Sequence, residues 1–216
     1  MLRQPFSNQL INHNNWDVIV IGAGAAGLMT CLELPDHLNI LLLNRNTSKK
    51  SSSRWAQGGI ASVVRPEDSF DLHANDTLKA GDGLCDPRAV NMLVKEAPIC
   101  VERLQQLGMI FDRNSDQLST TLEAAHSCRR VLHVKDRTGR ALVEVLEEQV
   151  ESKKNVLHCR GIRVTELLVE NKNCRGVQVL DGANLYWITS QAVVLATGGG
   201  GHLFTNTTNP AQSAGE

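Results

Sequence analysis

A short segment near the middle of the chain, residues 122–133, concentrates side chains that can bind a charged small molecule. Guanidinium groups bind carboxylates in a bidentate way, so the adjacent pair Arg129–Arg130 indicates a dicarboxylate ligand. Two other interpretations stay open at this point. The segment can be an ordered loop whose side chains satisfy one another, or a metal site built from His126, Cys128 and His133, although their irregular spacing does not match a standard zinc motif.

A second chemically suggestive stretch covers residues 51–61, where serines are followed by an aromatic side chain, an amide and a glycine pair. Hydroxyl groups and unobstructed backbone N–H groups can surround a polar ring or a diphosphate at close range. Serines and glycines also form ordinary loops, so the stretch by itself is weak evidence. Its candidate ligand-binding residues are Ser52, Ser53, Arg54, Trp55, Ala56, Gln57, Gly58 and Gly59.

The elements that would position this loop begin with a strand, a glycine turn, a helix and a second strand. A β-branched run over 17–21 predicts a strand buried on both faces, a helix over 28–34 ends before Pro35, and another apolar strand covers 39–43. The turn between them has the Gly-x-Gly-x-x-Gly spacing of dinucleotide-binding folds, in which a helix N-terminus faces a diphosphate. The turn consists of Gly22, Ala23, Gly24, Ala25, Ala26 and Gly27.

The end of the second strand does not distinguish between dinucleotides. An acidic residue commonly binds the ribose hydroxyls there, but this chain has Asn44 followed by Arg45. Asn44 can hydrogen-bond a hydroxyl without charge assistance, and Arg45 can bind a 2′-phosphate or remain a solvated loop cation. Nicotinamide and flavin dinucleotides are therefore both compatible with this position.

The glycine turn and the serine loop together resemble the flavoproteins related to succinate dehydrogenase and fumarate reductase, and within that group the L-aspartate oxidases. The sequence Ser-Arg-Trp-Ala-Gln-Gly-Gly-Ile-Ala and the later Glu-x-x-His-Ser-x-Arg-Arg segment carry the resemblance. It implies FAD as the cofactor, bound by the loop. Respiratory members have a histidine in this loop that bonds covalently to the flavin. Ser52 stands at that place, so we expect non-covalent FAD.

The resemblance also implies roles for individual residues. Glu123 would face the substrate amino group, and a carboxylate near an α-ammonium favours an amino acid over succinate. A solvated loop acid is the alternative for Glu123. His126 is either an active-site neighbour or a structural histidine. Further FAD contacts would come from Asn44 and Arg45, the latter at the place of a family basic residue near the adenosine end. The others are Arg163 and Val164 beside the adenine, Thr197, Gly198 and Gly199 after a second buried strand, and Glu216.

The implied reaction is FAD-dependent oxidation of L-aspartate to iminoaspartate, with oxygen or fumarate as the acceptor, at the start of NAD biosynthesis. Iminoaspartate would pass to quinolinate synthase. The family's catalytic base would lie beyond Glu216, so no catalytic residue is expected in this chain. The alternatives are a fumarate reductase or succinate dehydrogenase flavoprotein, and a truncated FAD-binding fragment without activity.

Composition is that of an ordinary globular protein. The 216 residues carry a net charge of −1 and only 4% aromatic side chains, which argues against nucleic-acid binding. No apolar run is long enough to cross a membrane, and six scattered cysteines without an export signal indicate reduced thiols in the cytoplasm. We expect a flexible lead over 1–15 and one FAD-binding domain over 16–216.

The expected fold is α/β, with a mainly parallel sheet and a β-meander. Apolar periodicity predicts three more helices, and Pro98 should kink or split the second of them, which Gly108 would end. Short apolar runs separated by turn residues predict the meander. The expected helices cover 68–80, 86–107 and 141–153, and the expected strands cover 156–158, 162–170, 176–180, 185–189 and 192–196.

Overall fold

The computed structural model describes residues 16–47, 51–210 and 213, so the expected lead over 1–15 and the candidate FAD contact Glu216 lie outside the described residues. The chain divides into two compact units. We call residues 1–55 with 146–216 the sheet unit and residues 56–145 the helical unit, and describe each by itself. Whether the chain forms one domain over 16–216 stays a prediction.

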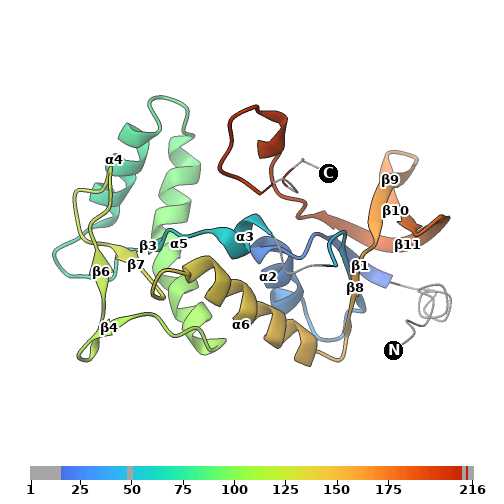
Figure 1. Cartoon of the computed structure of the whole chain (residues 1–216), viewed down its shortest axis with the longest axis horizontal. Coiled ribbons are helices and arrows are strands. Elements are labelled where there is room, and N and C mark those ends of the chain that lie inside the picture. The colour runs from blue at the N-terminus through green and yellow to red at the C-terminus, as the bar shows by residue number, and fades with distance from the viewer. Residues whose placement is uncertain (1–15, 48–50, 211–212, 214–216) are drawn as a thin grey trace. The chain divides into compact units, whose positions relative to one another are not determined.

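The sheet unit is built on a six-stranded sheet with the order β8-β2-β1-β11-β10-β9 (Figure 1). Strands β1 (Trp16–Ile21), β2 (Ile40–Asn44) and β8 (Val156–Arg160) run parallel to one another, as do β1 and the end of β11. Every residue from Ile40 to Leu43 is at most 1% exposed, as expected for a strand covered on both faces. The predicted α/β fold with a mainly parallel sheet is confirmed.

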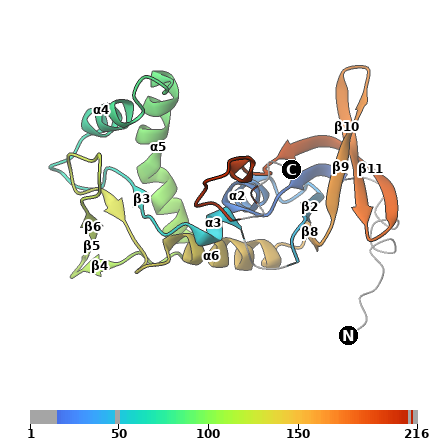
Figure 2. The ribbon, with the colours of Figure 1, turned by 45° about the horizontal axis from the view of Figure 1, so that its top comes forward.

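The remaining strands form the predicted antiparallel meander, with two corrections. It consists of β9 (Arg163–Glu170), β10 (Asn173–Asp181) and β11 (Asn184–Leu195), which stand together at one side of the sheet in Figure 2. The run 156–158, predicted as its first strand, belongs to the parallel part as β8. The runs 185–189 and 192–196 form one strand, because no glycine or proline separates them.

This long strand changes its partner along its length. Its first half pairs antiparallel with β10, from Asn184 to Thr189, and its second half pairs parallel with β1, from Ser190 to Leu195. The meander is thereby continuous with the parallel sheet. The carboxyl ends of β1 and β11 lie next to each other, since Ile21 is opposite Leu195.

Helix α2 (Ala25–Glu33) follows β1 and packs on β1 and β2 through residues that include Leu28 and Cys31, both fully buried. It ends before Pro35 as predicted. Lys153 donates from Nζ to the backbone oxygens of Leu32 and Leu34 at 3.4 and 3.1 Å, which satisfies carbonyl groups at the helix end.

The helical unit contains α4 (Phe70–Ala80) and α5 (Pro87–Gln106), which lie side by side in both views and bury Ala74, Val90 and Val94 between them. Helix α5 runs through Pro98 as one element, so the predicted split is wrong. Buried apolar residues on both sides of the proline hold the helix together: Val94 precedes it, and Val101 and Leu104 follow it.

Gly108 ends α5 as predicted. Its φ is 107°, and the N–H groups of Gly108 and Met109 donate to Gln105 and Leu104, the two bonds of a Schellman motif. The remaining elements of the chain are α3 (Ser52–Trp55), β3 (Ile60–Ala61), β4 (Arg113–Asn114), β5 (Gln117–Leu118), β6 (Thr120–Thr121), β7 (Val131–Leu132), α6 (Thr138–Ser152) and η1 (Gly201–Leu203). Within the described ranges, no helix combines the length and the apolar character needed to span a membrane.

Candidate functional site

The glycine turn of the sheet unit has the geometry that its spacing predicts. Gly22 has a φ of 106°, and a Cβ there would overlap the backbone oxygen of Ala196. A Cβ on Gly27 would overlap the oxygen of Gly22. The chain's own packing thus requires glycine at both positions. At Gly24 a Cβ would meet, within the described residues, only Ser53 Oγ at 3.2 Å. The turn therefore leaves its central backbone open to a ligand.

The serine loop reaches the start of α2. Ser53, in the short helix α3, accepts a hydrogen bond at Oγ from the backbone N–H of Ala25 at 3.2 Å. Gly24, the N-cap of α2, supplies no side-chain cap. The hydroxyl of Ser52 lies 2.5 Å from that of Ser213. The structure thus brings together the glycine turn and the serines that were both predicted to contact the cofactor.

The second nucleotide signal lies beside the first. Thr197, Gly198 and Gly199 follow β11, and the backbone nitrogen of Thr197 is 3.3 Å from the Cβ position of Gly22. Gly198 has a φ of 80°, and a Cβ on Gly198 or Gly199 would meet no described atom within 4 Å. Both glycine segments therefore lie at the carboxyl ends of neighbouring strands, where sheets of this type bind ligands.

The other candidate cofactor residues of the sheet unit have less distinctive surroundings. Asn44 accepts from Gly161 and Ile162 at its backbone oxygen and from the Asn46 N–H at Oδ1, so both of its oxygens shape the local chain. Arg45 is half-buried. Arg163 is exposed at the start of β9, and Val164 packs against the sheet core.

The end of the serine loop is mostly exposed. Arg54 lies 3.9 Å from Glu147, and Trp55 is 63% exposed. In the helical unit, Ala56 and Gln57 are exposed, and a Cβ on Gly58 would meet no described atom within 4 Å. A Cβ on Gly59, by contrast, would overlap Leu132 of β7, because β3 and β7 pair directly beyond it. Gly59 is thus required by packing, whereas Gly58 is not.

Glu123 lies at a recess of about 450 Å³ in the helical unit, lined in part by Thr121, His133 and Lys135. Its side chain is 43% exposed, and Oε1 is 3.0 Å from Nε2 of His133. The same Nε2 is 2.7 Å from Thr121 Oγ1. The structure therefore presents a paired carboxylate to an open recess. His133 was named in the sequence only as a metal ligand, and its contact with Glu123 was missed.

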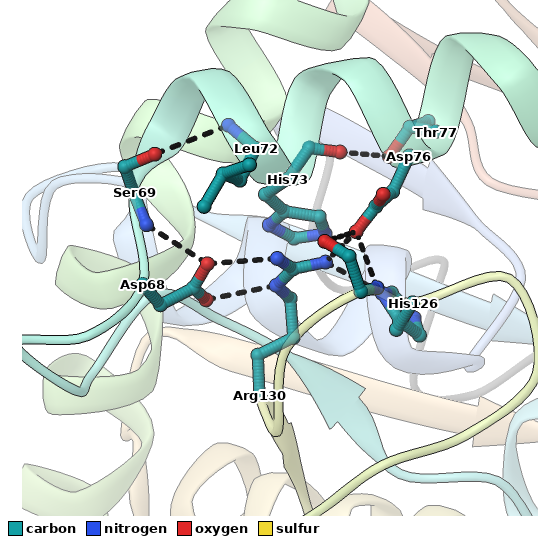
Figure 3. Close-up of polar contacts among 9 residues, drawn as sticks. Asp68, Ser69, Leu72, His73, Asp76, Thr77, His126 and Arg130 are labelled. Carbon is teal, nitrogen blue, oxygen red and sulfur yellow. Dashed lines mark hydrogen bonds and ion pairs between the residues drawn. The ribbon is translucent and has the colours of Figure 1, made fainter.

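Arg130 is fully buried and forms the centre of a polar cluster (Figure 3). Its Nε and Nη2 donate to Asp68 at 2.8 and 2.7 Å, and its Nη1 donates to Asp76 and, at 3.0 Å, to Nδ1 of His126. The predicted dicarboxylate site at Arg129–Arg130 is therefore wrong for Arg130, whose donors are occupied by the protein's own carboxylates. We call these residues, with the adjacent His73, the Arg130 cluster.

The cluster controls the protonation of its members. Burial alone would raise the pKa of Asp68, but the hydrogen bonds and charge of Arg130 outweigh burial and hold the pKa below its usual range. Burial would also raise the pKa of Asp76, but hydrogen bonds from Arg130 and Ser127 outweigh burial and lower the pKa to about 2. Burial and the positive charge of Arg130 lower the pKa of His73. The cluster thus holds ionised carboxylates around a cation.

The cluster also determines the tautomer of His126. A guanidinium group donates hydrogen bonds and accepts none, so Nδ1 of His126 must present a lone pair to Arg130. The proton of the neutral imidazole then sits on Nε2.

With Nδ1 of His126 and Nε2 of His133 engaged, two of the three side chains of the metal interpretation point to other partners. Nothing in the sequence linked Arg130 to Asp68 and Asp76, which precede it by more than fifty residues.

Comparison with known proteins agrees with this geometry. L-aspartate oxidase of Nostoc sp. is 46% identical over 94% of this chain and 36% of its own length, and that of Synechocystis sp. is 47% identical over 94% and 37%. The chain thus spans little more than a third of the length of these relatives. A solved quinol fumarate reductase of E. coli has a TM-score of 0.86 and 27% identity, over 92% of this chain and 35% of the other.

A family model described as an FAD binding domain matches residues 17–216, almost the whole of the described structure. Its cofactor fits the open backbone at Gly24 and the adjacent glycine segment after β11. The glycine turn, the serines that meet it and the strand that ends beside it are therefore parts of one nucleotide-binding architecture, and the chain belongs to the FAD-binding domain family.

Proposed function

We propose that this chain is the FAD-binding portion of an enzyme that oxidises L-aspartate to iminoaspartate. Glu123 carries the proposal, because it places a half-exposed carboxylate at a recess in a chain that is 46–47% identical to L-aspartate oxidases. An ionised carboxylate accepts hydrogen bonds from an ammonium group, and such a bond contributes about 1.5–3 kcal/mol. Succinate lacks the ammonium and cannot form it.

The residues that would hold FAD lie at the turn from β1 to α2, on the serine loop and after β11. The backbone at Gly24 and the start of α2 would bind the diphosphate, while Ser53 fixes the loop against that helix. FAD held by these residues would supply the acceptor for the hydride from the substrate Cα. Of the chain's own residues, Glu123 would bind and orient the amino group. His126, whose Nδ1 faces Arg130, has its proton at Nε2 and would donate to a carboxylate of the substrate. We propose that Ser52, a hydroxyl where covalent flavoproteins have imidazole, leaves FAD non-covalently bound.

We also propose an electron acceptor, a pathway and a cellular location, on the basis of the similarity to L-aspartate oxidases. Oxygen or fumarate would reoxidise the flavin, iminoaspartate would pass to quinolinate synthase in NAD biosynthesis, and the reaction would take place in the cytoplasm. A fumarate reductase activity is the second candidate, because the E. coli fumarate reductase shares the fold at a TM-score of 0.86. The difference lies in the amino group, which only the first candidate must recognise.

One experiment tests both the cofactor and the substrate. Purified chain is loaded with FAD, and acid precipitation should release the flavin into the supernatant. Binding and turnover are then measured with L-aspartate and with succinate. We expect a preference for L-aspartate that Glu123→Gln lowers by about 10- to 100-fold, the factor that corresponds to one charge-assisted hydrogen bond. A matched variant, Glu102→Gln, changes an exposed residue of α5 and should leave the preference unchanged.

Several outcomes would contradict the proposal. Flavin that stays with the precipitate would show a covalent bond. A preference for succinate would favour the fumarate reductase candidate. Equal dissociation constants for L-aspartate and succinate would show that Glu123 does not recognise the amino group. FAD binding and a preference for L-aspartate without turnover would, by contrast, agree with a chain that spans little more than a third of its relatives' length.

A further inference from the structure

We propose that His133 is a positioning residue that orients Glu123 for an amino group and thereby sets the preference for an amino acid over a plain dicarboxylate. The proposal deepens the proposed function and rests on it for the identity of the ligand. It concerns the contact between His133 and Glu123, whose Nε2 and Oε1 atoms lie 3.0 Å apart.

The hydrogen-bond partners determine where the proton of His133 lies. Nε2 is 3.0 Å from Oε1 of Glu123 and 2.7 Å from Oγ1 of Thr121. An ionised carboxylate only accepts hydrogen bonds, so Nε2 must carry the proton. The hydroxyl of Thr121 has its own acceptor, the backbone oxygen of Val131 at 3.5 Å, which leaves an oxygen lone pair for the same N–H. The proton of His133 therefore lies on Nε2, within 3.0 Å of both Glu123 Oε1 and Thr121 Oγ1.

The backbone and the serine loop hold the imidazole ring in place. His133 directly follows β7, and its backbone oxygen accepts from the N–H of Asp112 at 2.8 Å. A Cβ on Gly59 would lie 2.8 Å from Cε1 of His133, so the ring occupies the space that a side chain at Gly59 would need. The ring is only 19% exposed, whereas Glu123 is 43% exposed. An enclosed ring thus contacts a more exposed carboxylate.

The held carboxylate keeps a free oxygen at the recess. Among the described residues, His133 is the one side chain that hydrogen-bonds or pairs with Glu123, and it engages Oε1. Oε2 can then accept from an ammonium group. The recess is lined by three carboxylates, Asp112, Glu123 and Asp136, against one lysine, Lys135, so its charge favours a cationic group.

Two substitutions separate this role from packing. His133→Gln places an amide N–H near the position of Nε2 and keeps the donor, whereas His133→Leu keeps the bulk and removes it. In the FAD-loaded chain, dissociation constants of L-aspartate and succinate are measured for wild type and both variants. We expect His133→Leu to lower the preference for L-aspartate about tenfold and His133→Gln to stay within about threefold of wild type, since each factor of ten corresponds to about 1.4 kcal/mol.

A second measurement needs no substrate. Ring ¹⁵N spectra of the purified chain should show the proton of His133 on Nε2, and Glu123→Gln should shift this resonance while the control Glu102→Gln does not. A proton on Nδ1, or a resonance that ignores Glu123→Gln, would overturn the proposal. So would unchanged selectivity in His133→Leu, or an equal loss in both His133 variants. The spectra can show the expected proton on Nε2 and the expected shift in Glu123→Gln while wild type does not prefer L-aspartate. In that case the contact between His133 and Glu123 is supported, but the proposed function and the role of His133 in selectivity are wrong.

Discussion

The Arg130 cluster should make a large contribution to the stability of the helical unit, and Asp68→Asn tests it. The side chains of Arg130 and Asp68 are 0% and 1% exposed and share two hydrogen bonds of 2.7–2.8 Å. Removing one partner of a buried ion pair typically costs about 3–5 kcal/mol, because a charge remains without compensation. Asp76 still pairs with Arg130 in the variant, so we expect the lower end, about 3 kcal/mol.

The assay is urea unfolding at pH 7, with Arg140→Gln as the matched control. Arg140 forms a 3.0 Å pair with Glu144, but the two side chains are 52% and 45% exposed. Exposed pairs one helical turn apart contribute only about 0.3–0.5 kcal/mol. A loss below about 1 kcal/mol in Asp68→Asn, similar to the control, would refute the argument, because it would mean that water reaches the guanidinium group in solution.

The same cluster predicts how the loss depends on pH. The pKa values of Asp68 and Asp76 lie below their ordinary value of 3.8 in the folded chain. A depressed carboxyl pKa stabilises the fold above the unfolded value, and this stabilisation disappears as pH falls through the folded value, about 2 for Asp76. Wild type should therefore lose stability steeply between about pH 4 and 2, and Asp68→Asn should lose less over that range.

Two further predictions concern the sheet unit and the glycines. Gly27→Ala should destabilise the fold by at least about 1–3 kcal/mol through overpacking against Gly22, whereas Gly58→Ala should change stability by less than about 0.5 kcal/mol and weaken FAD binding, as thermal unfolding and flavin titration would show. Burial lowers the pKa of His158 to about 4 in the folded chain, so as pH falls the unfolded chain binds a proton at His158 before the folded chain does. Wild-type stability should rise between about pH 4 and 6.5, by up to about 1.4 kcal/mol per pH unit, and His158→Leu should flatten this rise in urea unfolding.

The parts of the fold that the sequence predicted are those in which neighbours along the chain determine the structure. The strand, glycine turn and helix from Trp16 to Glu33 follow from β-branched burial, two sterically required glycines and a terminating proline. The ends of α5 follow equally from Asp86 and Gly108. Such signals need no knowledge of distant partners.

The errors arose where a distant partner determines the structure. Strand β8 joins β2 across more than a hundred residues, and its apolar pattern also suits a meander strand. Ser190 and Gln191 suggested a break, but Ser190 continues β11 by pairing with Trp16. The pair Arg129–Arg130 suggested a dicarboxylate ligand. The carboxylates that bind Arg130 come instead from Asp68 and Asp76, which precede α5 in the sequence, whereas Arg130 follows it.

The segment from Glu123 to His133 thus combines two tasks that its composition could not separate. A buried ion cluster is weak evidence for net stabilisation, since apolar residues of equal volume often serve as well. Its hydrogen bonds are directional, however, and they fix the position of Arg130, which directly precedes β7. His133 directly follows the same strand. A displaced Arg130 would therefore move the residue that holds Glu123. Arg130, the structural cation of this segment, lies inward, and the groups suited to recognising a ligand lie at the recess.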